Sequence, residues 1–485
     1  MTTPDPAAAS AAPPAQTCDV LVIGSGAAGA AAALAAHEAG AHVIVVDKAP
    51  AARAGGNTRL SGGGWFVHDD PAAAATFLRA LCADRAVDDV VVTAWARETA
   101  ANTAWLRGLG APVERSADYH PQAEYAELPG ADCYLGMDTL GGMGEGLMHR
   151  FLTGALSDRG IEVRYDSQAT ELLRDDGAVT GALVGGEPIH ARGGTVLATG
   201  GFAADPAMVA DHLGIAGQVL WGSPDSTGDG HRMAAAAGAD FWHMTNHMAI
   251  TGIDMGRDTG MYLALWGAPN HLFVGADGRW FIDESAPPRH GHTRREGRDV
   301  LFPTHGFHLI GDAAMLRSGP LSPPRQVLPV GYEVLMRGSV WSADNRAEVD
   351  AGLIAEEPTI AALATRIGVE PEVLERTVAR YNDYCAAGRD DGFGRPAARL
   401  GAIEEGPFFA LPVTPLLGWT NGGPRRDEHA RVCAVSGAPI PGLYAAGEAS
   451  STYSWRKDGG FHIADALAFG RIAGRIAGRH AAARA

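Results

Sequence analysis

Apolar residues near the N-terminus are grouped in two short runs rich in β-branched side chains. The first, Cys18–Ile23, is followed by GSGAAG and then by an alanine-rich stretch that reaches Gly40. The second, His42–Val46, ends in Asp47. Such runs on either side of a helix-forming stretch predict two strands joined by a tight glycine turn and a helix. Strand, glycine turn, helix, strand and acidic residue is the order of a dinucleotide-binding βαβ unit.

The pattern continues with alternating helices and strands, which is typical of an α/β fold. Helices are expected at about 72–85, 90–108 and 144–159. Strands are expected at 161–165, as a pair of neighbouring strands within 169–185, and at Gly194–Ala198.

The character of the chain changes after about residue 245. A hairpin is expected at His271–Ile282, and helices at about 357–367 and 371–387. Towards the C-terminus, a strand is expected in PGLYAAGE (441–448) and a long helix over Ile463–Arg479, which repeats the strand, turn and helix pattern of the N-terminal part. We therefore expect a flexible tail (1–16), a Rossmann-like nucleotide-binding domain made of 17–245 and 413–485, and an inserted α+β capping domain (246–412).

Composition narrows the class of protein. Glycine accounts for 64 of the 485 residues, about twice the usual share, so many close backbone approaches or positive φ angles are expected. Hydrophobic residues make up 46% and charged residues 20%, which excludes a disordered or fibrous chain. The net charge of −17 argues against nucleic acid or an anionic membrane as a partner.

Cysteines and the N-terminus bear on the compartment. The five cysteines are scattered and form no CxxC pair, which favours reduced thiols in the cytoplasm over a metal site. The first 16 residues lack a basic start and a long apolar core, so we expect no signal peptide. The sequence contains no run of 18 apolar residues without charges, so we expect no membrane span.

Three glycines of the first turn have separate expected roles. Gly24 would make the tight turn, Gly26 would let the backbone approach a pyrophosphate, and Gly29 would let helix and strand pack closely. The helix N-terminus would direct partial positive charge at the phosphates. Asp47 would accept hydrogen bonds from a ribose and disfavour a 2′-phosphate. This unit alone does not distinguish NAD from FAD.

Further motifs carry a resemblance that makes this distinction. They are GGNTRLSGGG (55–64), ATGGF (198–202), STGDG (226–230) and PGLYAAGE (441–448), with Gly459-Gly460, a helix and FGRIAG (469–474) following. In this order they resemble the FAD-dependent fumarate reductase and 3-ketosteroid dehydrogenase superfamily from residue 18 to 479. In pattern they are nearest its tricarballylate dehydrogenase branch.

The resemblance implies non-covalent FAD. Glu448 would accept hydrogen bonds from the ribityl or adenosine part, and the helix starting near His462 would point N–H groups at the flavin C2 carbonyl. Asn57 matches the position where membrane-bound relatives carry a flavin-linked histidine. Besides Gly24, Gly26, Gly29 and Asp47, the expected cofactor contacts are Ala28, Lys48, Gly56, Asn57, Thr58, Ser61, Gly62, Gly63, Ala169, Thr199, Gly200, Asp229, Gly447, Glu448, Gly460, His462 and Ile463.

The resemblance also implies a substrate held between cap and flavin. The chemistry needs a donor or cation that polarises a carbonyl or carboxylate, and a side chain that handles a proton. Arg289 follows Asp283-Glu284 by five residues, as an arginine does in the tricarballylate branch, and is the first candidate for proton transfer or substrate anchoring. His290 and His292 are alternatives for that role, and a solvated basic loop is the structural alternative.

A second cluster lies in SSTYSWRKDGGFH (450–462). Arg456 falls where ketosteroid dehydrogenases have a polarising tyrosine, and Lys457 falls where fumarate reductases have a carboxylate-binding arginine. The Gly460 N–H would donate to the same group, and Tyr453 could add a phenol. The alternative is that both cations lie on the surface.

Two positions depart from fumarate reductases. His247 lies near their substrate-binding histidine, but its different spacing leaves a packed core histidine as an alternative. Trp419, in Trp419-Thr420-Asn421-Gly422-Gly423, replaces the histidine of HTMGG, which removes a carboxylate anchor and adds an apolar wall. Fumarate is therefore a poor substrate candidate.

Tyr119, Tyr125 and Tyr134 could line the pocket mouth or simply pack in their loop.

These observations predict an FAD-dependent oxidoreductase acting on a C–C bond next to a carbonyl or carboxylate, on a cyclic or bulky oxo-acid. We expect dehydrogenation, with electrons leaving to a separate acceptor, because no haem or iron–sulfur motif is present. A 3-ketosteroid dehydrogenase or ene-reductase is one alternative. A flavin-binding electron-relay subunit without substrate chemistry is the other.

Overall fold

The computed structural model describes residues 16–117, 120–144, 146–215, 217–256, 260–265, 269–285, 289–322 and 339–484. In the described part, all five cysteines are free. Among these residues, no helix is both long enough and apolar enough to cross a membrane.

The first sheet has eight strands and a parallel centre. Its main order is β21 (Arg431–Cys433), β22 (Pro439–Ala445), β9 (Glu187–Leu197), β1 (Gln16–Ile23), β2 (Val43–Val46) and β6 (Glu162–Arg164), with β8 (Ala178–Val184) also pairing with β9 and with β7 (Ala169–Asp175). Strands β22, β9, β1, β2 and β6 are parallel to one another. The predicted βαβ unit is therefore the centre of this sheet.

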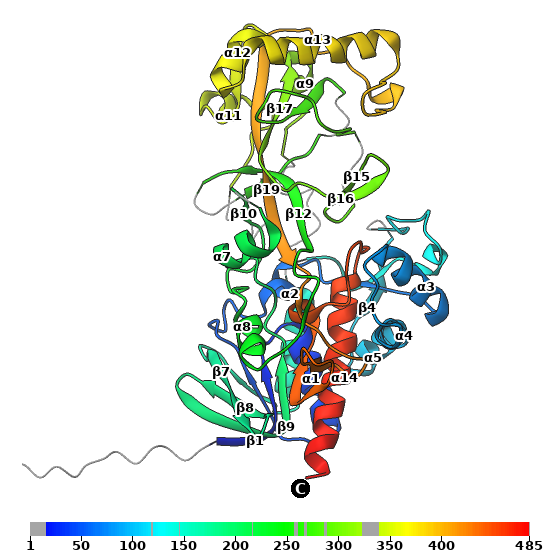
Figure 1. Ribbon diagram of the computed structural model, residues 1–485, viewed down its shortest axis with the longest axis vertical. Coiled ribbons are helices and arrows are strands. Elements are labelled where there is room, and N and C mark those ends of the chain that lie inside the picture. Colours follow the sequence, from blue (N-terminus) through cyan, green and yellow to red (C-terminus); the bar gives the residue numbers. More distant parts are fainter. Residues whose placement is uncertain are drawn as a thin grey trace, which may run out of the picture.

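Both faces of this sheet are buried, which explains its continuous apolar strands. Val20 and Val22 of β1 pack with the helices on one face, whereas Leu21 and Ile23 pack toward β7, β8 and α8 (Asp229–Ala236) on the other. Figure 1 shows α1 (Ala27–Glu38) and α14 (Phe461–Ala482) on the side of the sheet away from β7 and β8. Further helices of this part are α2 (Gly56–Leu60), α3 (Pro71–Cys82), α4 (Asp89–Ala100), α5 (Asn102–Gly108), α6 (Leu147–Asp158) and α7 (Pro206–Met208). The helix predicted at 90–108 is divided at Ala101 into α4 and α5.

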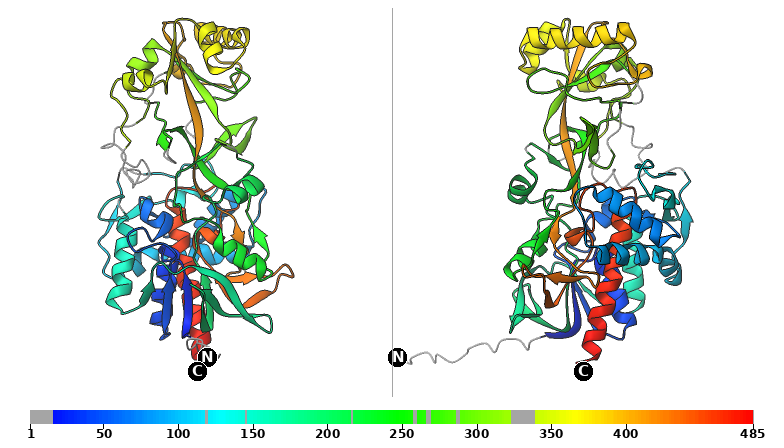
Figure 2. Two further views of the ribbon diagram at one scale, coloured as in Figure 1. Left: turned by 90° about the vertical axis from the view of Figure 1, so that its left-hand side faces the viewer. Right: turned by 45° about the vertical axis from the view of Figure 1, so that its right-hand side comes forward.

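Helices α1 and α14 run side by side in the same direction and pack unusually closely. A Cβ on Gly470 or Gly474 would overlap with the carbonyl oxygen of Ala28 or Ala32, respectively. One turn further on, a Cβ on Gly478 would lie 3.2 Å from the carbonyl oxygen of Ala36. The repeat of four residues on both helices keeps them in register, so their N-termini point to the same end of the molecule (Figure 2).

The second sheet lies above the first in Figure 1 and has seven strands. Its main order is β13 (Gly260–Tyr262), β12 (His247–Asp254), β19 (Phe408–Thr420), β17 (Phe307–Asp312) and β14 (His271–Val274), and β10 (Val219–Leu220) and β18 (Ala355–Glu357) also pair with β19. The helices of this part are α9 (Ala313–Arg317), α11 (Arg346–Asp350), α12 (Ile360–Ile367) and α13 (Pro371–Ala387). The expected boundary at residue 412 falls inside β19, and the domain limits stay a prediction.

Three small sheets complete the described part. They are β3 (Trp65–Phe66), β5 (Met137–Leu140) and β4 (Val113–Arg115); β11 (Phe241–Trp242) with β20 (Gly423–Pro424); and β15 (His292–Arg295) with β16 (Arg298–Leu301).

The turn predicted within His271–Ile282 is present, but the second arm of the hairpin is short. The chain does turn there, since the Gly275 N–H donates to the Arg279 carbonyl (3.0 Å). After this turn, Trp280 pairs with Val274 in a single antiparallel bridge, and its indole N–H donates to Glu284 (2.9 Å). Strand β14 therefore takes its antiparallel partner from β17.

The α1–α14 contact gives a stability prediction. Gly474→Ala should lower the free energy of unfolding by about 2 kcal/mol or more, because the added methyl group would overlap with backbone. The matched control is Gly154→Ala in α6, where an added Cβ meets nothing within 4 Å. It should raise that free energy by about 0.5–1 kcal/mol. Chemical denaturation of the two variants measures both, and equal stability would contradict the close contact.

Candidate active site

One cavity lies where the two helix N-termini meet the strand ends of the first sheet. Its wall includes Ile23 at the end of β1, Val46 at the end of β2, Ala28 in α1, Ile463 in α14 and Gly418 in β19. The cavity thus joins segments from both ends of the chain and the strand that leads into the second sheet.

Nearly all residues expected to contact the cofactor line this cavity. They are Gly24, Gly26, Ala28, Asp47, Lys48, Gly56, Asn57, Thr58, Ser61, Gly62, Gly63, Ala169, Thr199, Gly200, Asp229, Gly447, Glu448, Gly460, His462 and Ile463. Gly29 is not part of the wall. A Cβ on Gly29 would overlap with the carbonyl oxygen of Gly24, so its position fits the packing function expected for it.

The glycine turn after β1 forms a cradle for an anion. Gly24 has φ +104°, and a Cβ there would overlap with the Ala198 carbonyl. Gly26 caps α1 and offers no side chain to its first-turn amides, although the Ala27 N–H donates to Thr58 Oγ1 (2.9 Å). N–H groups at a helix start, reached over glycine, fit the pyrophosphate of a dinucleotide.

Asp47 fastens the glycine turn to the end of β2. Its Oδ2 accepts hydrogen bonds from the Ser25 amide (3.0 Å) and hydroxyl (2.6 Å), and its Oδ1 accepts from the Ala49 amide (2.9 Å). The carboxylate lies on the cavity wall, where it can also accept from a ribose.

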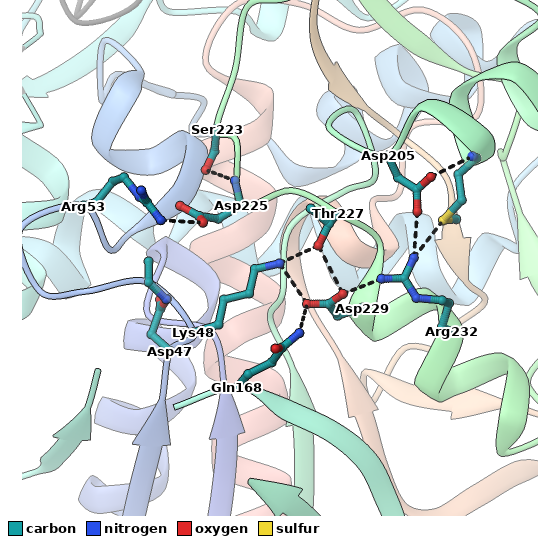
Figure 3. Close-up of polar contacts among 12 residues, drawn as sticks. Asp47, Lys48, Arg53, Gln168, Asp205, Ser223, Asp225, Thr227, Asp229 and Arg232 are labelled. Carbon is teal, nitrogen blue, oxygen red and sulfur yellow. Dashed lines mark hydrogen bonds and ion pairs between the residues drawn. The ribbon is translucent and has the colours of Figure 1, made fainter. Parts of the chain in front are cut away.

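Lys48 and Asp229 are paired with each other on the same wall (Figure 3). Lys48 Nζ lies 2.8 Å from Asp229 Oδ2, and the other carboxylate oxygen accepts from Thr227 Oγ1 (3.1 Å). Burial opposes ionisation of Asp229, but Lys48, Thr227 and Arg232 outweigh it and lower its pKa. A second pair, Arg53 with Asp225 (3.2 Å), lies beside them. These contacts hold the 226–230 turn against the end of β2.

Glu448 and Asn57 connect three segments in the middle of the cavity. Asn57 Nδ2 donates to Glu448 Oε2 (2.8 Å), and Asn57 Oδ1 accepts from the Ser223 amide (2.8 Å). The Thr420 amide donates to Glu448 Oε1 (3.3 Å). Burial raises the pKa of Glu448 to about 7, although these donors oppose the shift. Such a polar, adjustable group fits the hydroxyl-rich ribityl part of FAD.

Beyond Glu448 and Asn57, the cavity is lined by cationic and aromatic groups. Lys457 is only 3% exposed, and its Nζ lies 4.5 Å from the centroid of the Trp419 ring. Burial lowers the pKa of Lys457 to about 7, against the opposing effects of Glu124 and Asp458. Gly460 precedes the first turn of α14 at this wall. Glycine suits this position because φ is +76° and a Cβ there would press on the backbone of β3.

His462 completes this end of the cavity. Its ring centroid lies 5.3 Å from that of Trp419, and its Nε2 is buried without a hydrogen-bond partner among the described residues. Burial holds its pKa well below the ordinary value, so the imidazole is neutral. An unpartnered polar atom aimed at a cavity indicates a ligand group that completes it.

Arg289 and Arg456 do not reach the cavity wall. Arg289 pairs with Glu127 (2.6 Å) and lies over the Tyr125 ring at 4.1 Å. Arg456 pairs with Asp299 (2.8 Å) and donates to the Leu81 carbonyl. Asp299 is also 3.7 Å from Arg289, so both guanidinium groups anchor loops to one another.

Tyr453, His247 and His292 are packed in the protein interior. The Tyr453 hydroxyl donates to the Phe461 carbonyl and accepts from Trp95 Nε1 (3.1 Å), so it faces away from the cavity. His247 is 1% exposed, and burial lowers its pKa to about 4. His292 packs edge-on against Trp455.

The tyrosines considered for the pocket mouth also have other contacts. Tyr125 donates to the Arg289 carbonyl (3.0 Å), Tyr134 donates to the Gly459 carbonyl (3.3 Å), and Tyr119 lies outside the described residues.

Sequence reasoning missed His120, Glu124 and Trp221. His120 and Trp221 line the cavity, and Glu124 lies directly behind His120. His120 and Glu124 occupy a loop without helical or strand periodicity, so no local pattern marks them. Trp221 follows the two-residue strand β10, which is too short to be recognised.

Comparison with known proteins agrees with this geometry. A family model described as an FAD binding domain matches residues 19–467. The chain belongs to the FAD-dependent fumarate reductase and 3-ketosteroid dehydrogenase superfamily. FAD is accordingly its cofactor.

Two curated relatives and one solved structure illustrate the likeness. The chain is 32% identical over 355 residues to 4-oxocyclohexanecarboxylate 2-dehydrogenase of Sinomonas cyclohexanicum, covering 67% of this chain and 58% of that one. It is 30% identical over 340 residues to NADH:acrylate oxidoreductase of Vibrio harveyi, covering 67% and 31%. The chain thus spans less than two thirds of either relative. A flavocytochrome c3 fumarate reductase structure in an open conformation aligns with TM-score 0.68 and 28% identity, covering 96% of this chain and 79% of that one.

The environment of Asn57 gives a prediction about cofactor attachment. Its amide is held between Glu448 and Ser223 and is no nucleophile, so FAD should be bound without a covalent bond. Acid precipitation of the holoenzyme should release all flavin into the supernatant, measured by its visible absorbance. Free FAD mixed with denatured protein serves as the recovery control, and a pellet that stays yellow would contradict the prediction.

Proposed function

We propose that this chain catalyses the removal or addition of two hydrogens across a C–C bond next to a ketone or carboxylate of a cyclic oxo-acid. FAD, when bound, supplies the hydride acceptor or donor for this chemistry. A separate small molecule or protein exchanges electrons with the chain. The observation that carries the proposal is the buried ammonium group of Lys457 beside the Trp419 ring in the cavity.

Lys457 is suited to bind and polarise an oxygen of the substrate. Among the described residues it has no ion-pair partner, although it is almost fully buried. A buried charge without a partner is costly, so an anion or carbonyl oxygen beside it recovers much of that cost. The same contact draws electrons from the carbonyl and acidifies the neighbouring C–H bond.

Trp419 favours a ring over a short, linear diacid. Its indole presents a flat apolar surface next to Lys457, and its Nε1 has no hydrogen-bond partner in the described part of the chain. A cation, an indole N–H and an aromatic face together suit a ring that carries an oxygen substituent. The relative named for 4-oxocyclohexanecarboxylate supports the same substrate class.

The alternatives have less support. A ketosteroid dehydrogenase that polarises its ketone through Tyr453 would need that hydroxyl in the cavity, whereas it is bonded to the Phe461 carbonyl. A relay subunit without substrate chemistry gives no reason for the buried cation at Lys457.

Five free cysteines suit a reducing compartment, so we place the enzyme in the cytoplasm.

The test is anaerobic mixing of the holoenzyme with a panel of compounds. The panel contains 4-oxocyclohexanecarboxylate, cyclohexanone, succinate and a saturated 3-ketosteroid, with their unsaturated counterparts added to dithionite-reduced enzyme. The ring oxo-acid pair should bleach or restore the flavin absorbance faster than the others. If no compound changes the flavin that dithionite reduces, the proposed function fails. A faster response to the steroid would favour that alternative.

Lys457 predicts the pH dependence of substrate binding. Because its pKa is about 7, the ammonium is present below pH 7 and is lost as the pH rises, so KM for an anionic substrate should increase above pH 7. Lys457→Met should raise KM about 10- to 100-fold at low pH, the loss of one hydrogen bond to a charged group, and should flatten the profile. Lys457→Arg stays charged and should keep KM low at high pH. A parallel rise of KM in all three proteins would contradict this role.

A further inference from the structure

Two imidazoles and one carboxylate meet at the cavity beside Lys457. His290 Nδ1 lies 2.7 Å from Glu124 Oε2, and His120 Nδ1 lies 3.3 Å from Glu124 Oε1. The centroids of the two imidazole rings are 5.5 Å apart, and both rings line the cavity. Glu124 therefore bridges two histidines that face the space expected to hold the substrate.

A tight reversal of the chain sets the position of His290. The Arg289 amide donates to the His292 carbonyl (2.7 Å), and the His292 amide donates back to the Arg289 carbonyl (3.0 Å). His290 has φ +42° and Gly291 has φ +81° within this turn. A Cβ on Gly291 would lie 3.1 Å from Met248 Cα, so the turn rests directly on β12. The imidazole is thus presented from a turn held at both ends.

Arg289 ties this turn to the loop that carries Glu124. Its guanidinium donates to the Glu124 carbonyl (3.1 Å) and pairs with Glu127, while Tyr125 donates to its backbone carbonyl. The Glu124 amide in turn donates to Asp458 Oδ2 (2.8 Å), next to Lys457. These bonds fix the distance between the Glu124 carboxylate and the His290 ring.

We propose that His290 is the catalytic residue that exchanges the proton with the substrate, and that Glu124 is the positioning residue that holds its imidazole. The proposal rests on the proposed function of the same cavity. In dehydrogenation, His290 Nε2 takes H⁺ from the carbon next to the carbonyl. The electron pair of that deprotonated C–H bond would become the C=C bond as the neighbouring carbon loses a hydride, which FAD would accept when bound. In the reverse direction His290 returns the proton.

The surroundings of His290 suit this task. Its Nδ1 lies 2.7 Å from Glu124 Oε2 as an ion-pair contact that lacks hydrogen-bond alignment in these rotamers, and no hydrogen bond from the described residues reaches its Nε2. A carboxylate at Nδ1 selects the tautomer with Nε2 free to accept a proton, and stabilises the imidazolium that forms. Arg289, the candidate from sequence, is permanently charged and points at Glu127, so it can act only by holding the turn.

The charges that face His290 come from several elements. Glu124, His120 and Lys457 surround it, and His462 approaches from the start of α14. Burial and Lys457 lower the pKa of His290, and Glu124 opposes them, so the ring is neutral near pH 7 as a base must be.

The three ligating atoms of His120, Glu124 and His290 also lie within 4.8 Å of one another, which is close enough for a metal ion. The ammonium of Lys457 beside them disfavours a second cation.

The first experiment needs no substrate. Histidines of the holoenzyme are labelled with ¹⁵N, and the His290 signal is assigned by its loss in His290→Gln. We expect one tautomer, with the proton on Nδ1, and a fall in the His290 pKa in Glu124→Gln. Glu372→Gln, which changes an exposed carboxylate of α13 outside this cluster, is the control and should change neither. An unchanged tautomer and pKa in Glu124→Gln would overturn the positioning role. A stoichiometric metal that copurifies with wild type and is lost in His290→Gln would overturn the proton role.

The second experiment follows anaerobic flavin reduction by the compound that reduces wild type. His290→Gln should slow reduction about 10²- to 10⁴-fold with FAD content and substrate affinity retained. Glu124→Gln should slow it less and move the acidic limb of the pH profile to lower pH, and Glu124→Asp should restore part of both. A rate for His290→Gln close to that of wild type would overturn this inference and leave the proposed function standing. A wild type that no compound reduces would overturn both.

Discussion

The contact between α1 and α14 is the constraint on which the site depends. Gly470 and Gly474 let the two helix backbones approach without side chains between them, in the same direction and in register. Each helix begins at a glycine, Gly26 or Gly460, that has no side chain of its own to cap the first-turn amides. One N-terminus therefore faces the pyrophosphate end of the cavity, and the other faces its catalytic end. Two segments that are far apart in the chain become one cofactor surface because glycine removes the space between them.

Strand β19 connects this surface to the second sheet. It pairs with β17 and β18 over its first half and with β12 over its second, and near its end Trp419 lies in the cavity wall. The Thr420 amide reaches Glu448, so the strand end is tied to the cofactor side as well. The apolar wall for the substrate thus stands on an element held by both sheets, which limits how far Trp419 can shift relative to Lys457.

The cofactor side could be predicted because its signals are local. A strand, a glycine turn and an acid at fixed spacing determine both the βαβ unit and the direction in which Gly24, Gly26 and Asp47 face. The substrate side could not be predicted in the same way. Sequence places Arg289 and Arg456 near the right part of the chain, but Glu127 and Asp299, which decide where the guanidinium groups point, lie far away in sequence. Likewise, Glu124 pairs with His290 across 166 positions of the chain, and no periodicity marks such a contact.

The closeness of the two helices also has a consequence for the order in which the protein can be made. Synthesis runs from the N-terminus, so β1, α1 and β2 leave the ribosome long before β22 and α14 exist. Until then Thr195–Leu197 of β9 lack their β22 partner, and the face of α1 that packs against Gly470 and Gly474 is uncovered. The amides that start α14 are among the last parts of the cavity to be synthesised. The amides at the start of α14 can face FAD only after this helix has been synthesised, so capture of FAD in its final position follows the synthesis of α14.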